Sequence, residues 1–288
     1  MSLSRRDLAA FAALAGAMPA PVQSAPADSG LRRSYAPSPF GQTHLVQAGP
    51  TGGRRPPLVL LHLMPFSGVW WRPLQTALAD RATIAIDLAG CGGSDAAPTQ
   101  PQLAAYGDAV LAALNHLGLR RVDLMGYHTG GAVAADLAVR RPERVRRLIL
   151  AGVPLFGPAE HAARTASLGP RDYGAPGAVE ARWKQIRDWF PALPLARQLE
   201  LFAESLRIGA NGHWPLKAIL DWDAEASLKA IRHPCLVPVL DESLKANTIA
   251  AAALIPGAQR LDLPGFGEDA FDVHANEIAR QINRFLDA

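Results

Sequence analysis

Apolar residues in this chain follow two alternating patterns. Short, largely apolar runs are typical of strands covered on both faces, and they occupy 58–62, 82–87, 122–125, 145–151, 235–240 and 259–263. Between these runs apolar residues recur every three to four positions, which predicts helices over 70–80, 100–117, 130–140, 243–254 and 270–286. The alternation indicates an α/β protein with a mostly parallel sheet and helices on both of its faces.

Two segments depart from this alternation. After a Pro/Ser-rich lead at 34–39, residues 40–48 predict a strand at the edge of the sheet. From 154 to 226 the strands stop, and the segment is helical and rich in Pro, Gly and aromatic residues. An insertion between two strands covers the carboxyl ends of a parallel sheet, so we expect a lid there with aromatics that mainly pack. Accordingly, 28–153 and 227–288 form one core, and 154–226 is the lid.

The amino terminus has the order of features expected of an export signal. Ser4-Arg5-Arg6-Asp7-Leu8 resembles a twin-arginine signal, and a short apolar run and a small-residue cleavage site at Ala25-Pro26-Ala27 follow it. The apolar run is too short to anchor the protein in a bilayer. We therefore expect residues 1–27 to be removed and the protein to be periplasmic or secreted, with no membrane anchor.

The composition of the chain limits the kinds of molecule that the protein is expected to bind. The chain has 29 Lys and Arg against 26 Asp and Glu, and its basic residues are scattered without the clusters that nucleic-acid grooves use. Two cysteines, Cys91 and Cys235, exclude a cysteine-rich metal site, and they are expected at opposite edges of the sheet and so unpaired. We expect a monomer or homodimer that takes a small, fairly apolar molecule, with no cofactor and no metal.

The stretch from Val122 to Ala138 reads as a buried strand, an abrupt turn and an amphipathic helix. The turn is Gly126-Tyr127-His128-Thr129-Gly130, here called the elbow. Glycines flanking such a turn hold the middle side chain exposed at the carboxyl end of the sheet. That side chain is His128, and Tyr127 is expected to pack beneath it.

Four landmarks together resemble the α/β-hydrolase fold from about Phe40 to the end of the chain. They are His62-Leu63-Met64-Pro65, Asp87 to Asp95, the elbow, and Leu263-Pro264-Gly265-Phe266-Gly267. The resemblance implies an eight-stranded, mostly parallel sheet with helices on both faces and a helical lid. It also implies a range of activities, including those of esterases, lactonases and lyases. The elbow G-Y-H-T-G is similar to a subgroup with histidine in place of the elbow serine.

The resemblance also assigns candidate site residues. Glu268 stands where the family has its general-base histidine, and Asp241 or Glu242 follows the strand that precedes the acid. The backbone N–H groups of Met64 and Thr129 would form an oxyanion hole, although Leu63 replaces the family's glycine. Other histidines are expected to have no chemical role: His62 as a structural hydrogen-bonder, His274 as a solvated helix residue, and, at surface or lid positions, His44, His116, His161, His213 and His233.

A histidine at the elbow changes the expected mechanism. If Glu268 orients the imidazole, His128 is a general base or a nucleophile that cleaves small esters or lactones. The same base could serve a cofactor-free lyase or isomerase. Two other readings remain: a non-catalytic protein whose pocket only holds a ligand, and a metal site formed by His128, Glu268 and a carboxylate from Asp241 or Glu242.

Overall fold

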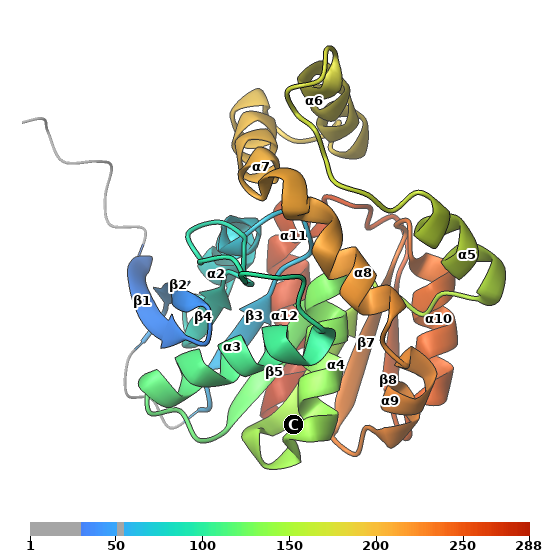
Figure 1. Ribbon diagram of the computed structural model, residues 1–288. Helices are drawn as coiled ribbons and strands as arrows, with labels where there is room; N and C mark the ends of the chain where they lie inside the picture. Colours follow the sequence, from blue (N-terminus) through green and yellow to red (C-terminus); the bar gives the residue numbers. More distant parts are fainter. Residues whose placement is uncertain (1–29, 51–54) are drawn as a thin grey trace, which may run out of the picture.

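The computed structural model describes residues 30–50 and 55–288; the predicted export signal, 1–27, lies outside them. In the described part, eight strands form one sheet in the order β1-β2-β4-β3-β5-β6-β7-β8 (Figure 1). Their bounds are β1 Arg32–Ser38, β2 Gly41–Ala48, β3 Leu58–Leu61, β4 Thr83–Ile86, β5 Val122–Tyr127, β6 Val145–Ala151, β7 Cys235–Leu240 and β8 Gln259–Leu263. β1 pairs with β2 and β2 with β4 in antiparallel fashion, and the other pairs are parallel. The expected mostly parallel sheet is thereby confirmed.

The prediction that 40–48 is the edge strand was wrong, because β1 lies outside β2. We expected no strand in the Pro/Ser-rich lead, yet Arg32 to Ser38 pairs along its whole length with β2. Proline is tolerated on an edge strand because its missing N–H then faces solvent instead of a partner. Pro37, opposite Gln42, occupies such an edge position.

Helices cover both faces of the sheet and divide the core in two. The flanking elements are η1 Gly68–Trp71, α2 Arg72–Ala77, α3 Leu103–His116, α4 Thr129–Arg140, η2 Pro142–Arg144, α10 Lys245–Leu254, α11 Ala270–Val273 and α12 Ala275–Asp287. α3, α4 and α10 pack on one face, and η1, α2 and α12 pack on the other. Each face therefore has its own apolar cluster, with buried strand residues contributing to both. None of the described helices is long and apolar enough to cross a membrane.

The segment between β6 and β7 is helical. It contains α5 Pro158–Ala166, α6 Ala178–Trp189, α7 Leu195–Arg207, η3 Gly209–His213, α8 Trp214–Leu220 and α9 Ala224–Ala230. Figure 1 shows α6 and α7 beyond one end of the sheet and farthest from the strands, with α5 and α8 closer to them. α9 instead packs against α4 and α10. Residues of α5, α6 and α8 line one cavity together with the elbow, so these three helices cover the carboxyl ends of the strands.

The closing helix is interrupted where one continuous helix was expected. α11 ends at Val273 and α12 begins at Ala275, so His274 lies between them. Its ring stacks on Phe266, with 3.9 Å between ring centroids. His274 is therefore a half-buried packing residue and not a solvated residue within a helix.

Candidate active site

The elbow joins β5, near the centre of the sheet, to α4. His128 has φ 49° and ψ −113°, and it is the only non-glycine residue with positive φ in the described part of the chain. Gly126 and Gly130 make this turn possible: a Cβ on Gly126 would lie 2.1 Å from the carbonyl oxygen of Gly130, and one on Gly130 equally close to that of Leu61. A strained conformation at one residue costs about 1–3 kcal/mol and is found most often at functional sites. The sharp turn expected from the sequence is present, with His128 at its apex.

His128 is held by a buried carboxylate. Its Nε2 lies 2.9 Å from Oε2 of Glu242, whose side chain is 1% exposed. The same oxygen accepts hydrogen bonds from the N–H of Leu244, at 2.8 Å, and from Oγ of Ser243, at 3.3 Å. The other oxygen, Oε1, is buried without a hydrogen-bond partner among the described residues. Within the same residues no group is bonded to Nδ1 of His128, so one ring nitrogen is engaged and one is free.

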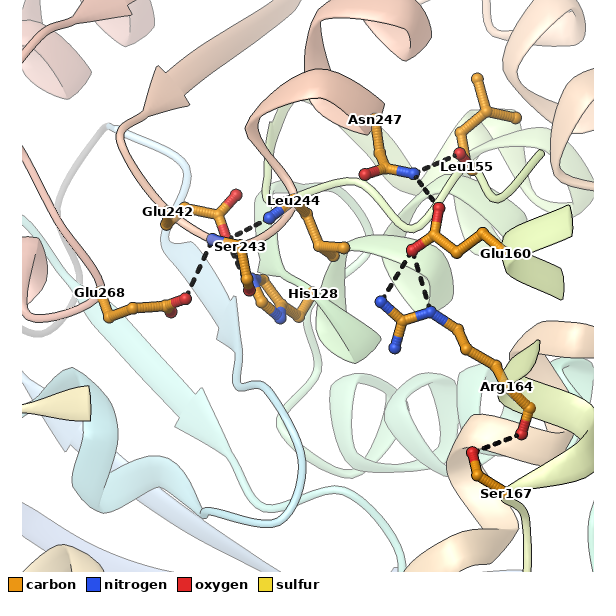
Figure 2. Close-up of polar contacts among 10 residues, drawn as sticks. All are labelled: His128, Leu155, Glu160, Arg164, Ser167, Glu242, Ser243, Leu244, Asn247 and Glu268. Atoms are coloured by element: carbon orange, nitrogen blue, oxygen red, sulfur yellow. Dashed lines mark hydrogen bonds and ion pairs between the residues drawn. The ribbon is translucent and has the colours of Figure 1, made fainter. Parts of the chain in front are cut away.

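Glu268 lies beside this pair (Figure 2). Its Oε1 accepts a hydrogen bond from the N–H of Ser243 at 3.0 Å, and its Oε2 accepts one from the hydroxyl of Tyr127 at 3.3 Å. Tyr127 is fully buried under the elbow, as expected. Burial, together with the nearby Glu268 and Glu242 carboxylates, raises the pKa of the Tyr127 hydroxyl well above its ordinary value. The hydroxyl therefore stays protonated and acts as a donor.

The three acidic candidates occupy different places. The hydrogen bond to the imidazole that we expected from Glu268 is made instead by Glu242. Asp241 turns away: it pairs with Lys245 and accepts the N–H of Gly265 at 2.6 Å, and these two contacts lower the pKa of its carboxyl. The N–H of Asp241 is bonded to the carbonyl of Phe266, so the chain still follows the sheet there, and the next side chain, Glu242, turns to the elbow.

The expected oxyanion donors border the same cavity as His128. Thr129 is the first residue of α4, and its N–H belongs to the first turn, whose donors have no acceptor within the helix. Met64 lies opposite, in the loop after β3. That loop is held to the elbow by the hydrogen bond from Gly130 N–H to the carbonyl of His62. Met64 and Thr129 thus line the same cavity as His128.

Two other histidines are structural. The structure confirms this for His62, which accepts the N–H of Leu88 at Nε2, 2.9 Å away, while its Nδ1 contacts the carbonyl of Leu63. Burial lowers the pKa of His62, which favours the neutral ring. His44 is not the surface residue that we expected: its Nδ1 lies 2.8 Å from the buried carboxylate of Asp87. Asp87 also accepts the N–H groups of Gly68 and Gly93, so the pair ties three loops together.

A cavity of about 340 Å³ separates the elbow from the lid. Most of its lining is apolar, and its ionisable groups are His128 and Glu268 from the core and two arginines from the lid. The full set is Leu63, Met64, Pro65, His128, Thr129, Pro154, Phe156, Arg164, Arg171, Trp189, Phe190, Gly212, Leu216, Ile219, Ser243, Leu244 and Glu268. A half-enclosed, apolar cavity with a few polar groups is the usual setting for a small-molecule site.

His128, Glu242 and Glu268 are also the group in the described chain that could hold a metal ion. One potential ligand atom from each lies within 4.8 Å of the others. One nitrogen and two carboxylate oxygens would suit a borderline divalent cation such as Zn²⁺ or Fe²⁺.

The fold and the elbow define the class of protein. Residues 56–232 match the family described as alpha/beta hydrolase fold. This chain belongs to the α/β-hydrolase family.

Particular relatives and structures are similar over most of the chain. The RutD protein of Rhizobium rhizogenes, which carries the name of a carbamate hydrolase, is 32% identical over 237 residues, which cover 77% of this chain and 89% of that protein. The enol-lactonase of Burkholderia xenovorans LB400 is 20% identical with a TM-score of 0.75, covering 88% of this chain and 100% of that one. A thermophilic esterase from Thermogutta terrifontis is 22% identical with a TM-score of 0.72, covering 89% and 98%. At this level of identity the two structures show the fold alone.

Three polar residues at the cavity were not singled out from the sequence: Ser243, Arg164 and Arg171. Ser243 could have been found, because it directly follows the Asp-Glu pair expected to supply the acid. Nothing in the sequence marks the two lid arginines among the many others.

Proposed function

We propose that this protein hydrolyses small esters, lactones or similar activated carbonyl compounds, with His128 as general base and Glu242 as the carboxylate that orients it. The observation that carries the proposal is the 2.9 Å contact between Nε2 of His128 and Glu242 at the apex of the elbow, in the wall of the cavity. A hydrolase that lacks a hydroxyl or thiol at the elbow must use water, or the imidazole itself, as the nucleophile.

The contacts of the imidazole support one tautomer. Because the Glu242 carboxylate only accepts hydrogen bonds, the neutral ring carries its hydrogen on Nε2 and a lone pair on Nδ1. In the proposed reaction Nδ1 takes a proton from a water molecule as the water oxygen bonds to the substrate carbonyl carbon. The N–H groups of Met64 and Thr129 receive the negative carbonyl oxygen. When the intermediate collapses, the C–O bond to the leaving group breaks and the proton on Nδ1 passes to the departing oxygen.

The magnitudes are sufficient for reactive substrates. A positioned base contributes about 10²- to 10⁴-fold and one oxyanion donor about 10²- to 10³-fold. An acceleration of about 10⁴-fold or more is sufficient for the hydrolysis of activated esters and lactones but insufficient for the hydrolysis of amides.

Glu268 has a supporting part in this proposal. Its carboxylate holds the N–H of Ser243, next to Glu242, and the hydroxyl of Tyr127, next to His128. It therefore connects the two chain segments that carry the base and its partner. In the variant mechanism, Nδ1 attacks the carbonyl directly and water then cleaves the acyl-imidazole.

The test compares the purified protein with His128→Ala on p-nitrophenyl acetate, phenyl acetate, γ-butyrolactone and dihydrocoumarin in buffer containing EDTA. The matched control is His116→Ala, which removes an exposed histidine at the end of α3. We expect kcat/KM to fall about 10²-fold or more in His128→Ala and to stay unchanged in the control. Turnover that His128→Ala leaves intact, or no turnover at all, would contradict the proposal and favour a ligand-binding protein or a lyase. Wild-type activity abolished by EDTA and restored by Zn²⁺ would favour a metal site.

A further inference from the structure

The lid contributes an unpaired positive charge to the cavity. The side chain of Arg171 lines the cavity and makes no hydrogen bond or ion pair with any other residue that the structure describes. Its backbone N–H is bonded to the carbonyl of Ala210, and its side chain passes against Gly212, where a Cβ would lie 3.3 Å from Cδ of the arginine. Arg171 is thus an exposed arginine at the rim of the cavity, and its side chain has no partner among the described residues.

A second guanidinium, that of Arg164, is held in place beside the same cavity. Its Nε and Nη2 both donate to Oε1 of Glu160, at 3.0 and 2.8 Å, and the group stacks over the ring of Phe156 at 4.2 Å. Oε2 of Glu160 in turn accepts a hydrogen bond from Asn247 of α10, at 2.8 Å. Figure 2 shows this chain of contacts, with the guanidinium on the side of Arg164 that faces His128. Nη1 is left without a partner in the described chain.

The charges of the cavity are therefore divided between its two walls. At the core wall stands Glu268, with Glu242 buried behind His128, and neither carboxylate has an arginine or lysine partner in the described chain. At the lid wall the charge of Arg164 is matched by Glu160, and the charge of Arg171 is not matched. A ligand with a carboxylate is repelled from the core wall and attracted to the lid wall. Only one orientation of such a ligand satisfies both walls.

We propose that the substrate carries a carboxylate at the end remote from its reactive carbonyl, and that Arg171, with Nη1 of Arg164, binds this carboxylate. An unpaired arginine presents a planar fork that fits a carboxylate through two parallel hydrogen bonds. Apolar residues such as Phe190 and Ile219 also line the cavity and suit a short hydrocarbon linker. The assignment of a reactive carbonyl rests on the proposed function, whereas the carboxylate site does not depend on it.

The first experiment compares two esters that differ only in a terminal carboxylate, p-nitrophenyl butyrate and mono-p-nitrophenyl glutarate. The variants are Arg171→Gln and Arg164→Gln, and the control is Arg187→Gln, which removes an exposed lid arginine that does not line the cavity. We expect Arg171→Gln to raise KM for the anionic ester about 10- to 100-fold and to change KM for the neutral ester much less. Arg171→Lys should keep part of the affinity for the anionic ester, and the control Arg187→Gln should match wild type on both esters. Equal kinetics on both esters in every variant would overturn the inference while leaving the proposed hydrolysis intact.

A binding measurement separates the inference from the proposed function. Calorimetric titration of the protein with glutarate should give binding that weakens about 10-fold or more in Arg171→Gln but not in Arg187→Gln. Such binding by a protein that hydrolyses neither ester would support the carboxylate site and contradict the proposed hydrolysis. Glutarate binding that is undetectable, or equal in wild type and Arg171→Gln, would overturn the carboxylate site.

Discussion

Replacing Glu242 by glutamine removes the charge at the proposed base while changing its geometry little. The amide oxygen can take the position of Oε2, where it still accepts from Leu244 N–H and from Nε2 of His128. The amide NH₂ then takes the position of Oε1, which has no partner in the wild type. Any loss of activity in Glu242→Gln therefore measures the negative charge.

The size of the effect follows from the distance between the two groups. When His128 takes up a proton, a positive and a negative charge lie 2.9 Å apart. Their attraction is about 6 kcal/mol at an effective dielectric constant of about 20. His128 is 19% exposed, so solvent screens part of this attraction. We take about half of it, about 3 kcal/mol, as the stabilisation of the transition state. Glu242→Gln should therefore lower kcat/KM about 10²-fold.

The comparison variant is Asp241→Asn, the same chemical change one residue earlier. Asp241 faces Lys245 and Gly265, so this variant should keep kcat/KM within about threefold of wild type. The assay is kcat/KM on the best activated ester, with circular dichroism and thermal unfolding to verify that both variants fold. Wild-type kcat/KM in Glu242→Gln, or an equal loss in Asp241→Asn, would refute the reasoning.

Two further predictions concern stability and thiol chemistry. Burial raises the pKa of Asp87, but hydrogen bonds from His44, Gly68 and Gly93, together with the nearby His62, bring the pKa below its ordinary value. The ionised carboxylate therefore stabilises the fold above about pH 4, and this stabilisation is lost as the pH falls through the pKa of the folded state. Asp87→Asn should thus lower the free energy of unfolding, measured by urea denaturation, by about 2–4 kcal/mol at pH 7. The gap between wild type and variant should shrink below about pH 4. A gap that stays the same at every pH would contradict the prediction. Burial also raises the pKa of Cys235 to about 12 and that of Cys91 well above its usual range, and both thiols are free. Neither should react with Ellman's reagent at pH 8 until the protein is unfolded, when two thiols should react; rapid labelling of the native protein would count against this burial.

Local sequence signals predicted the elbow, but they could not show which carboxylate contacts His128. The elbow is set by neighbouring residues, since Gly126 and Gly130 permit the turn around His128 wherever a strand meets a helix in this way. Which of Asp241 and Glu242 reaches His128 depends on contacts with a distant segment, because Asp241 is bonded to Gly265 and Phe266 in the loop after β8. The strand β1 escaped prediction for a similar reason, because pairing with β2 decides its conformation more than its own composition does.

The positions of the charged groups show how a histidine in place of the family's elbow serine changes the chemistry of the site. In the family pattern the elbow supplies the nucleophile. The acid follows the next-to-last strand, and the histidine follows the last strand. Here the imidazole stands on the elbow, and the acid loop after β7 still supplies its partner, Glu242. On the proposed mechanism the carboxylate and the imidazole therefore remain a pair, and the hydroxyl that the family places at the elbow is missing. The loop after β8, where the family has its histidine, carries Glu268, which braces Tyr127 and Ser243 around that pair. A site arranged in this way forms no acyl-serine at the elbow, so on the proposed mechanism its rate is set by how well the cavity positions a water molecule between Nδ1 of His128 and a substrate held at the lid wall.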